Sequence, residues 1–306
     1  MDNDGTPVTQ EHAARLRLDT SAVSLVLDVL VALGVAERKG GRIGIYDALS
    51  SDAHLLVGDL LSTQALWSHL PHFLQTGDRY ARMDGPAGER SASYQQVVRA
   101  LGRLFENAAL ELARRLPPPG ERVLDVGAGS GVWSLAMCAR SPSAKLFALD
   151  LPAVLPACLE RPRSLGLAER VEQIAGDYHS IELPAASFDR IILANVLHLE
   201  SPEDAASLVT RAAHALKPAG ELVVIDSLTD DEPILAPARA IYALHLAMRT
   251  HQGRVHPRTE ISRWARAAGL SDGRLIVPHA PPLGIAALVH RAVSATPKTP
   301  ARRRRP

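Results

Sequence analysis

The sequence predicts an α/β protein with a Rossmann-like, mostly parallel seven-stranded sheet whose last strand is antiparallel, preceded by a mostly helical, winged-helix-like domain. Three observations predict this class. Strand-like runs alternate with helical stretches after residue 120, a glycine-rich loop follows the first such run, and a helix-helix-hairpin pattern opens the chain. The 306 residues suffice for two domains, which we place at 1–92 and 93–296, followed by a disordered tail at 297–306.

Polar residues that commonly cap helices predict the elements of the first domain. Thr9 predicts one helix. Thr20 or Ser21 predicts the start of a second helix, which Gly34 ends. Residues 35–46 then predict a two-stranded hairpin around a Gly-Gly turn. We expect this winged-helix-like unit to serve dimerisation.

A DNA-binding regulator is the alternative that a winged helix raises, because helix-turn-helix units place their second helix in the major groove. Residues 1–60 hold five basic and nine acidic side chains, the opposite of what phosphate binding needs. The second helix, 21–33, contains no Lys or Arg. Base and phosphate contacts depend on such donors, so the charges disfavour DNA binding.

The overall composition predicts a cytoplasmic protein without a metal, a membrane partner or a nucleic-acid partner. Its 34 basic and 33 acidic side chains leave a net charge of +1, which attracts neither nucleic acid nor anionic lipid. Cys138 and Cys158 have no metal-ligand spacing. The most apolar run, 22–36, is interrupted by Asp28 and is shorter than the ~20 residues that cross a bilayer.

The second half of the chain alternates strands and helices. Residues 63–116 are expected to be mostly helical, with a break at 84–88. Strands are then expected at 122–126, 145–150, 171–175, 190–195, 221–226, 274–277 and 285–291. Only 279–284 join the last two strands, too few residues for a crossover helix, so the final strand should be antiparallel.

A glycine-rich loop after the first strand predicts a small-molecule site. Its glycines, Gly127, Gly129 and Gly131, let the backbone approach a ligand at the carboxyl end of the sheet. A dinucleotide-binding dehydrogenase is the alternative, but its GxGxxG pattern needs a glycine where Val132 stands. Asp125, just before the loop, suits an ammonium group better than a pyrophosphate, because a carboxylate repels phosphate.

Acids and polar residues at the next strand ends extend this site. Asp150 ends the second strand, where a carboxylate can accept from both hydroxyls of a ribose. Asp177, followed by Tyr178, could accept from an exocyclic amine beside an aromatic ring. Leu151 and Asn195 complete the expected cofactor-binding set. The pattern predicts a cationic adenosyl ligand, and the alternative is that the acids only cap loops and helices.

Three runs carry a family resemblance: VLDVGAGSGVWSLAMCARSPSAKLFALDLPAV, AGDYHSIELPAASFDRIILANVLH and LKPAGELVVIDS. They resemble class I S-adenosylmethionine-dependent methyltransferases, and more closely the small-molecule O-methyltransferases. That group contains plant caffeic acid and isoflavone, acetylserotonin and bacterial antibiotic-pathway O-methyltransferases. The resemblance covers nearly the whole chain. It implies S-adenosylmethionine as cofactor, a small hydroxylated aromatic or polyketide-like acceptor, and a homodimer.

The same resemblance implies that His198, at the end of the fourth strand, is the general base for the acceptor's hydroxyl. Histidine titrates near neutrality, and a positioned base typically accelerates a reaction ~10²- to 10⁴-fold. The alternative is a histidine that only forms hydrogen bonds at a strand end. A family member repurposed for another reaction is a further alternative.

The chain departs from the family around the expected base. The family usually has an acid directly after the histidine, where Leu199 stands. Asp226 lies where some members carry an orienting glutamate, and Pro257, beside His256, replaces a second one. We therefore expect His198, Asp226 and His256 to form the catalytic group with a changed orientation, or proximity of the reactants to dominate.

Four further residues are candidates for binding the acceptor. The resemblance places His245, Met248 and His251 on a helix that lines the acceptor pocket in the family. Met248 has a structural alternative, a core position at helical spacing from Leu244. Trp133, just after the glycine loop, is expected either to contact a bound molecule or to pack in the core.

Overall fold

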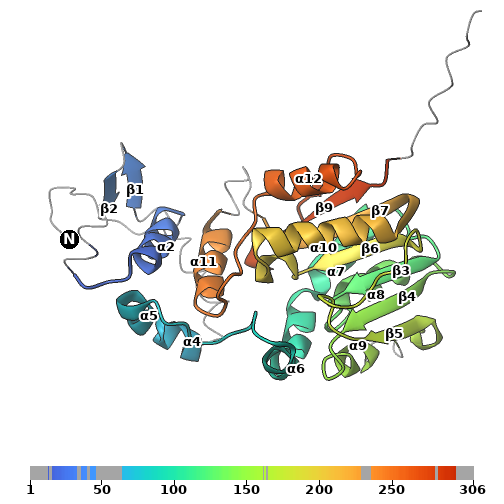
Figure 1. Ribbon diagram of the computed structural model, residues 1–306, viewed down its shortest axis with the longest axis horizontal. Coiled ribbons are helices and arrows are strands. Elements are labelled where there is room, and N and C mark those ends of the chain that lie inside the picture. Colours follow the sequence, from blue (N-terminus) through green and yellow to red (C-terminus); the bar gives the residue numbers. More distant parts are fainter. Residues whose placement is uncertain are drawn as a thin grey trace, which may run out of the picture.

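The computed structural model describes residues 13, 16–32, 36–39, 42–45, 64–160, 162, 165–228, 236–279 and 282–293. A layered α/β unit holds most of these residues, and a smaller helical part lies to one side of it (Figure 1). Helix α11 (Ala236–Ala247) stands between the two parts (Figure 1).

The α/β unit is built on one sheet. Its strands are β3 (Arg122–Val126), β4 (Lys145–Asp150), β5 (Val171–Ala175), β6 (Phe188–Ala194), β7 (Leu216–Ser227), β8 (Arg274–Ile276) and β9 (Ile285–Arg291). They form a seven-stranded sheet in the order β5-β4-β3-β6-β7-β9-β8. The pairs from β5 to β7 are parallel, and β9 is antiparallel to both β7 and β8. The predicted fold class is confirmed.

Helices cover both faces of the sheet (Figure 1). They are α7 (Glu106–Arg115), α8 (Val132–Cys138) and α9 (Pro156–Glu160) on one face, and α10 (Pro202–Ala215) and α12 (Arg258–Ala267) on the other. Successive strand residues alternate between two cores: Val123 packs with α7 and α8, and Leu124 with α10. This is the period of two that a strand imposes, and it places the Asp125 side chain on the α8 face.

Short 3₁₀ helices connect several of these elements. They are η2 (Ala168–Arg170), η3 (Leu197–Leu199) and η5 (Pro282–Gly284). The η3 turn follows β6 directly and carries His198. The predicted fourth strand therefore ends at the carboxyl edge of the sheet with His198 in a buried turn.

The helical part begins with the predicted second helix and hairpin. Its elements are α2 (Thr20–Ala32), β1 (Ala36–Lys39), β2 (Arg42–Ile45), α4 (Gln64–Ser68) and α5 (Leu70–Thr76). The antiparallel pairing of β1 with β2 confirms the hairpin. The cap of α2 is not Thr20 or Ser21 but Asp19, whose Oδ1 accepts from the Ala22 N–H at 2.8 Å. Most of the helix expected from Thr9 lies outside the described residues. The tail expected at 297–306 lies wholly outside them.

One helix crosses the expected domain boundary, and another holds the two parts together. Helix α6 (Ala87–Leu104) runs unbroken across the boundary expected at residues 92 and 93. Helix α11, which follows β7 in the chain, packs against α2 and α5 through Leu244 and Met248. The helical part therefore rests on an element that belongs to the C-terminal half of the sequence.

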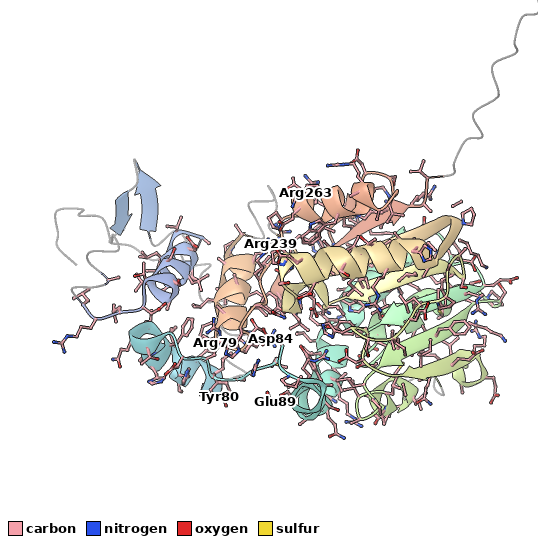
Figure 2. All side chains as sticks on the ribbon, in the orientation of Figure 1. Arg79, Tyr80, Asp84, Glu89, Arg239 and Arg263 are labelled. Carbon is pink, nitrogen blue, oxygen red and sulfur yellow. The ribbon has the colours of Figure 1, made fainter. Side chains whose placement is uncertain are left out.

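The segment between α5 and α6 is held by the end of α11. The Tyr80 N–H donates to the Met248 carbonyl at 2.7 Å, and the Met83 N–H donates to the Arg249 carbonyl at 2.8 Å. Asp84 Oδ2 accepts from the backbone N–H groups of His251 and Gln252. Figure 2 shows Arg79, Tyr80 and Asp84 along this segment, next to α11. These contacts hold the loop beside the end of α11.

The described residues contain neither a membrane-spanning helix nor a cluster of metal ligands. None of the helices in those ranges is long and apolar enough to cross a bilayer. No group of three His, Cys, Asp or Glu side chains among them could hold a metal ion. Cys138 and Cys158 are both free and buried.

Candidate active site

A pocket lies at the carboxyl ends of β3, β4 and β6, with side chains of α6 on its other side. It holds about 740 Å³ of empty space, including its opening to solvent. Of the predicted site residues, those that line it are Gly127, Gly129, Trp133, Asp150, Leu151, Tyr178 and Asn195. The structure thus brings most of the expected cofactor-binding residues together.

The glycine loop leaves no space for side chains at two of its positions. Gly127 has a φ of +68°, and a Cβ there would lie 2.8 Å from Val196 Cγ2. Gly131 has a φ of +66°, and a Cβ there would lie 2.7 Å from Cys158 Sγ. Gly127 lines the pocket, whereas Gly131 serves the turn into α8 and its packing. Glycine is required at both positions, for backbone conformation and for space.

Asp150 is held rigidly at the edge of the pocket. Its Oδ2 accepts from the Gly129 N–H at 2.7 Å, and its Oδ1 accepts from the Leu151 N–H at 2.7 Å. Burial raises the pKa of Asp150, while the two N–H donors act in the opposite direction. Each carboxylate oxygen can accept more than one hydrogen bond, so both remain able to bind hydroxyl groups.

Asp125 is not in the pocket, contrary to the sequence-based expectation. Its side chain is 2% exposed, and one of its oxygens accepts from the hydroxyl of Ser134 on α8. Burial raises the pKa of Asp125 to about 7. The residue is the fourth of five in β3, the strand expected at 122–126, and strand alternation directs its carboxylate under α8 and not toward the loop.

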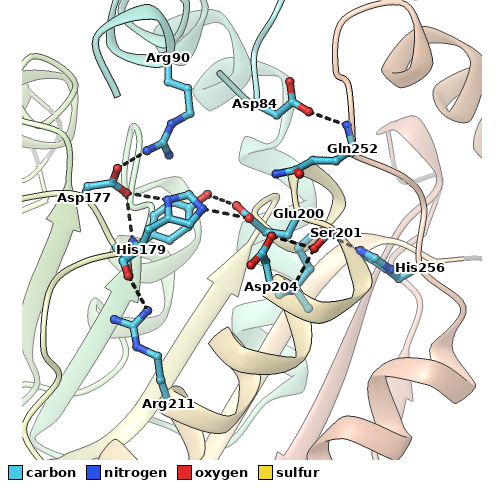
Figure 3. A network of polar contacts seen from close by, with 12 residues as sticks. Asp84, Arg90, Asp177, His179, Glu200, Ser201, Asp204, Arg211, Gln252 and His256 are labelled. Carbon is cyan, nitrogen blue, oxygen red and sulfur yellow. Dashed lines mark hydrogen bonds and ion pairs between the residues drawn. The ribbon is translucent and has the colours of Figure 1, made fainter. Parts of the chain in front are cut away.

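Asp177 also differs from its expected role. Arg90 of α6 forms an ion pair with its Oδ2, and Nδ1 of His179 lies 2.8 Å from its Oδ1 (Figure 3). Despite partial burial, the hydrogen bonds from His179 and the charge of Arg90 lower the pKa of Asp177. Arg90 lines the pocket and Asp177 does not, because the guanidinium covers the carboxylate that was expected to meet the ligand.

Glu200, the nearest acid after His198, belongs to the same network rather than to the base. Its Oε1 accepts from the Tyr178 hydroxyl at 2.6 Å, and its Oε2 lies 2.9 Å from Nε2 of His179 (Figure 3). The hydrogen bond to Glu200 raises the pKa of His179, and burial raises that of Tyr178. Glu200 is therefore engaged on the side of the pocket formed by β5.

His198 and Asp226 meet at the ends of two adjacent parallel strands. Nδ1 of His198 lies 2.6 Å from Asp226 Oδ1, and the His198 backbone N–H donates to Oδ2 at 3.2 Å. Both side chains are buried, with the His198 residue 3% exposed. The structure thus places Asp226 beside His198. The neighbours Val196 and Leu199 line the pocket, whereas His198 does not.

The other ring nitrogen of His198 has a partner that sequence reasoning missed. Its Nε2 lies 2.9 Å from the hydroxyl oxygen of Tyr242 on α11. That oxygen also accepts from Nη2 of Arg249 at 3.1 Å. Tyr242 lies on α11, and Arg249 follows in the turn after the helix ends at Ala247. No local pattern links either residue to His198.

His256 acts on the backbone that carries His198 and not on its ring. Its Nε2 lies 2.9 Å from the Leu197 carbonyl oxygen, and its Nδ1 lies 3.3 Å from Nε of Arg254. The residue is 2% exposed, and burial lowers its pKa. The structure places His256 where it supports the η3 turn, outside the catalytic group expected for it.

The three expected acceptor residues of α11 and the segment after it lie in different environments. Met248 is 0% exposed in the core with Ala22 and Leu244, so its expected position in the pocket is wrong. His251 is also outside the pocket, with half of its side chain exposed. His245 lies next to the Tyr242 ring, 6.1 Å away, and burial lowers its pKa to about 3. Helical spacing puts residues 244 and 248 on the α2 face, away from His198.

The comparisons with known proteins identify the family. Residues 84–271, more than half of the chain, match the model of the O-methyltransferase domain. The chain belongs to the O-methyltransferase family. The resemblance seen in the sequence is thereby confirmed. A relative from Streptomyces sahachiroi, a 3-hydroxy-5-methyl-1-naphthoate 3-O-methyltransferase, is 25% identical over 287 residues, which cover 87% of this chain and 80% of the relative.

Solved structures of the family share this fold. An O-methyltransferase family 2 protein from Planctomyces limnophilus, in complex with apigenin, matches with a TM-score of 0.68 and 24% identity, covering 95% of this chain and 87% of that one. Human N-acetylserotonin methyltransferase, in complex with SAM, matches with a TM-score of 0.61 and 22% identity, covering 92% and 86%. The O-methyltransferase fold therefore extends beyond the matched domain into the N-terminal helical part.

Proposed function

We propose that this O-methyltransferase uses S-adenosylmethionine to methylate a hydroxyl group of a small aromatic or polyketide-like molecule. The observation that carries the proposal is the buried pair of His198 and Asp226, next to a glycine-lined pocket at the same sheet edge. The cofactor, when bound, supplies an electrophilic methyl group on a sulfonium. The reaction also needs a base that removes the proton of the acceptor's hydroxyl, and in this proposal His198, oriented by Asp226, is that base.

The pocket fits an adenosyl ligand. Its backbone comes close at Gly127 and Gly129, where any side chain would reduce the space. Asp150 presents a fixed carboxylate for the two ribose hydroxyls. The indole N–H of Trp133, which lines the pocket, has no acceptor among the described residues, so a ligand heteroatom could satisfy it. Asn195, with a φ of +57°, adds an amide at the end of β6.

Asp226 would orient and tune the base. An ionised carboxylate only accepts hydrogen bonds, so Nδ1 of neutral His198 donates to it and Nε2 keeps the lone pair that takes up a proton. When His198 becomes protonated, the adjacent carboxylate stabilises the imidazolium. This pairing compensates for Leu199, which stands where the family usually has an acid.

The proposed acceptor is aromatic because the lining suits a flat, apolar molecule. Val98, Leu101, Phe105 and Leu199 contribute apolar surface to the pocket. The relative from Streptomyces sahachiroi acts on the 3-hydroxyl of a naphthoate. Hydroxynaphthoates, naphthols, phenols and hydroxyquinones are therefore the acceptors to screen.

Calorimetry and mass spectrometry test the proposal together. The protein is expected to bind S-adenosylmethionine and to add one methyl group to at least one hydroxyl of that panel. A duplex oligonucleotide serves as the control ligand and is expected not to bind. Absence of cofactor binding, or binding with no methylated product across the panel, would contradict the proposed function.

We also infer a homodimer with the N-terminal residues 1–92 at its interface, the methyltransferase domain at 93–296, and a cytoplasmic location. The dimer rests on the family resemblance, and the location on the two free cysteines, Cys138 and Cys158. Light scattering after size-exclusion chromatography tests the dimer. A monomer at micromolar concentration would contradict it.

A further inference from the structure

Nε2 of His198, the nitrogen that would accept the substrate's proton, already has a hydrogen-bond partner. The Tyr242 hydroxyl lies 2.9 Å from it, and the two rings meet edge to face, 5.3 Å apart at 89°. Tyr242 is 4% exposed and His198 is 3% exposed. In this arrangement no acceptor hydroxyl can reach Nε2 without displacing Tyr242.

The chemistry of the neighbours sets the direction of these hydrogen bonds. Arg249 has only donors, so the Tyr242 oxygen accepts from it at 3.1 Å. His198 donates through Nδ1 to Asp226, so its Nε2 accepts, and the Tyr242 hydroxyl must donate to it. A tyrosine oxygen has two acceptor sites, and Arg249 uses one. The second is free for the O–H of a bound acceptor.

Tyr242 also belongs to the apolar cluster that borders the pocket. That cluster contains Leu199 and has the partly buried Tyr94 packed against it, and both of these residues line the pocket. Neither His198 nor Tyr242 is part of the lining. Leu199 and Tyr94 therefore connect the pocket to the cluster that holds Tyr242.

We propose that Tyr242 relays the acceptor's proton to His198, an inference that rests on the proposed methyl transfer. The acceptor's hydroxyl proton moves to the Tyr242 oxygen while the Tyr242 proton moves to Nε2. The acceptor oxygen forms its bond to the methyl carbon as the carbon–sulfur bond breaks, and that electron pair stays on sulfur. Tyr242 ends unchanged, and His198 ends as an imidazolium beside Asp226.

The surroundings of Tyr242 keep its hydroxyl protonated in the resting protein and stabilise its oxygen during proton transfer. Burial raises the pKa of Tyr242, so the hydroxyl stays protonated at neutral pH. The Arg249 guanidinium, whose Cζ is 5.6 Å from the ring centre, stabilises negative charge that develops on the oxygen during transfer.

The first test compares acceptors of different acidity. With two acceptors that the wild-type protein methylates, one weakly acidic naphthol and one acidic hydroxyquinone, Tyr242→Phe is expected to lower kcat on the naphthol on the order of 10²-fold. The loss on the hydroxyquinone should be under about threefold, because an ionised acceptor needs no base. Tyr80→Phe, the same change at an exposed ring, is the control and should leave both rates unchanged.

A double variant separates a relay from a merely structural role. If the proton passes through both groups, His198→Ala combined with Tyr242→Phe should be no slower than His198→Ala alone, since either change breaks the same path. If the losses of the two single variants multiply in the double variant, the two residues act independently, and the relay is overturned. Unchanged or faster turnover by Tyr242→Phe on both acceptors would show that Tyr242 only covers His198, and would also overturn it.

Nuclear magnetic resonance gives a readout that needs no turnover and no variant. In the wild-type protein, the Tyr242 hydroxyl proton should exchange slowly and show a nuclear Overhauser contact with the His198 ring. Its absence, with the ring resonances assigned, overturns the inference while leaving methyl transfer intact. If the wild-type protein methylates no acceptor, the proposed function is contradicted, and the relay falls with it.

Discussion

The proposed cofactor side of the site consists of short segments at neighbouring strand ends, whereas the base side consists of single residues from distant parts of the chain. The glycine loop at 127–131 and Asp150 contact each other within 21 residues of sequence. His198 meets Asp226 from the next strand and Tyr242 from a helix. The difference predicts separable effects: changes on the cofactor side should alter affinity, and changes on the base side should alter turnover.

The largest effect should come from the base side. His198→Ala is expected to lower kcat on a weakly acidic naphthol by ~10²- to 10⁴-fold, since the base acts on the acceptor. Calorimetry should find the S-adenosylmethionine affinity unchanged. His251→Ala, at a half-exposed histidine outside the pocket, is the control. Retention of more than about a third of the wild-type rate would contradict the base assignment, because a tenfold loss is only ~1.4 kcal/mol.

The second prediction concerns Asp125, buried behind the cofactor side. Its pKa, raised from 3.8 to about 7 by burial, means that the folded protein binds a proton more tightly than the unfolded chain. Its contribution is therefore most favourable below pH ~4 and is lost as pH rises toward 7, by a few kcal/mol in total at about 1.4 kcal/mol per pKa unit.

Thermal unfolding between pH 5 and 8 measures this effect. Asp125→Asn cannot ionise, so its Tm relative to wild type should rise with pH over that range. The exposed Asp272→Asn should run parallel to the wild-type curve. Parallel curves for Asp125→Asn as well would show that Asp125 titrates as an ordinary acid.

The third prediction tests the cofactor side directly. Asp150→Ala should weaken S-adenosylmethionine binding by about 1.5–3 kcal/mol, the value of hydrogen bonds to a charged group. The kcat at saturating cofactor should change little, in contrast to His198→Ala. Calorimetry measures the affinity and initial rates measure kcat. An affinity within ~0.5 kcal/mol of wild type would refute the ribose assignment.

The smallest effect should separate backbone strain from crowding in the glycine loop. Gly127 and Gly166 have nearly equal φ values, +68° and +66°, but only a Cβ at Gly127 meets a neighbour, 2.8 Å away. Gly166→Ala should lose about 1–2 kcal/mol of stability from strain alone. Gly127→Ala should lose more and also bind the cofactor more weakly. Equal losses in chemical denaturation would show that the contact with Val196 is relieved easily.

Local patterns were sufficient for the cofactor side, except where a side chain leaves the sheet edge. The positions of Gly127, Asp150 and Asn195 follow from strand ends and from loop composition, which neighbours in sequence determine. Asp125 was misplaced although β3 ends where expected, because alternation along the strand directs its carboxylate under α8 and not toward the loop. Asp177 was misjudged because Arg90, 87 residues earlier, covers it.

On the base side, local sequence patterns were not sufficient to predict the site. His198 and Asp226 could be named from the resemblance, but neither Tyr242 nor Arg249 carried a signal that linked it to them. Met248 was assigned to the pocket from the resemblance, and the structure bears out the alternative, a core position, because a helical period does not say which face meets which partner. That choice depends on α2 and α5, which cover the face carrying Leu244 and Met248.

Local sequence patterns were enough to predict the sheet, the glycine loop and the family, because alternating patterns, strand ends and backbone freedom are properties of consecutive residues. The side chains that complete the base could be identified only from the folded chain. A hydrogen bond between residues 44 apart, such as that of Tyr242 with His198, exists only once α11 has packed between the helical part and the sheet. Long-range packing therefore governs the part of the site that local patterns could not predict.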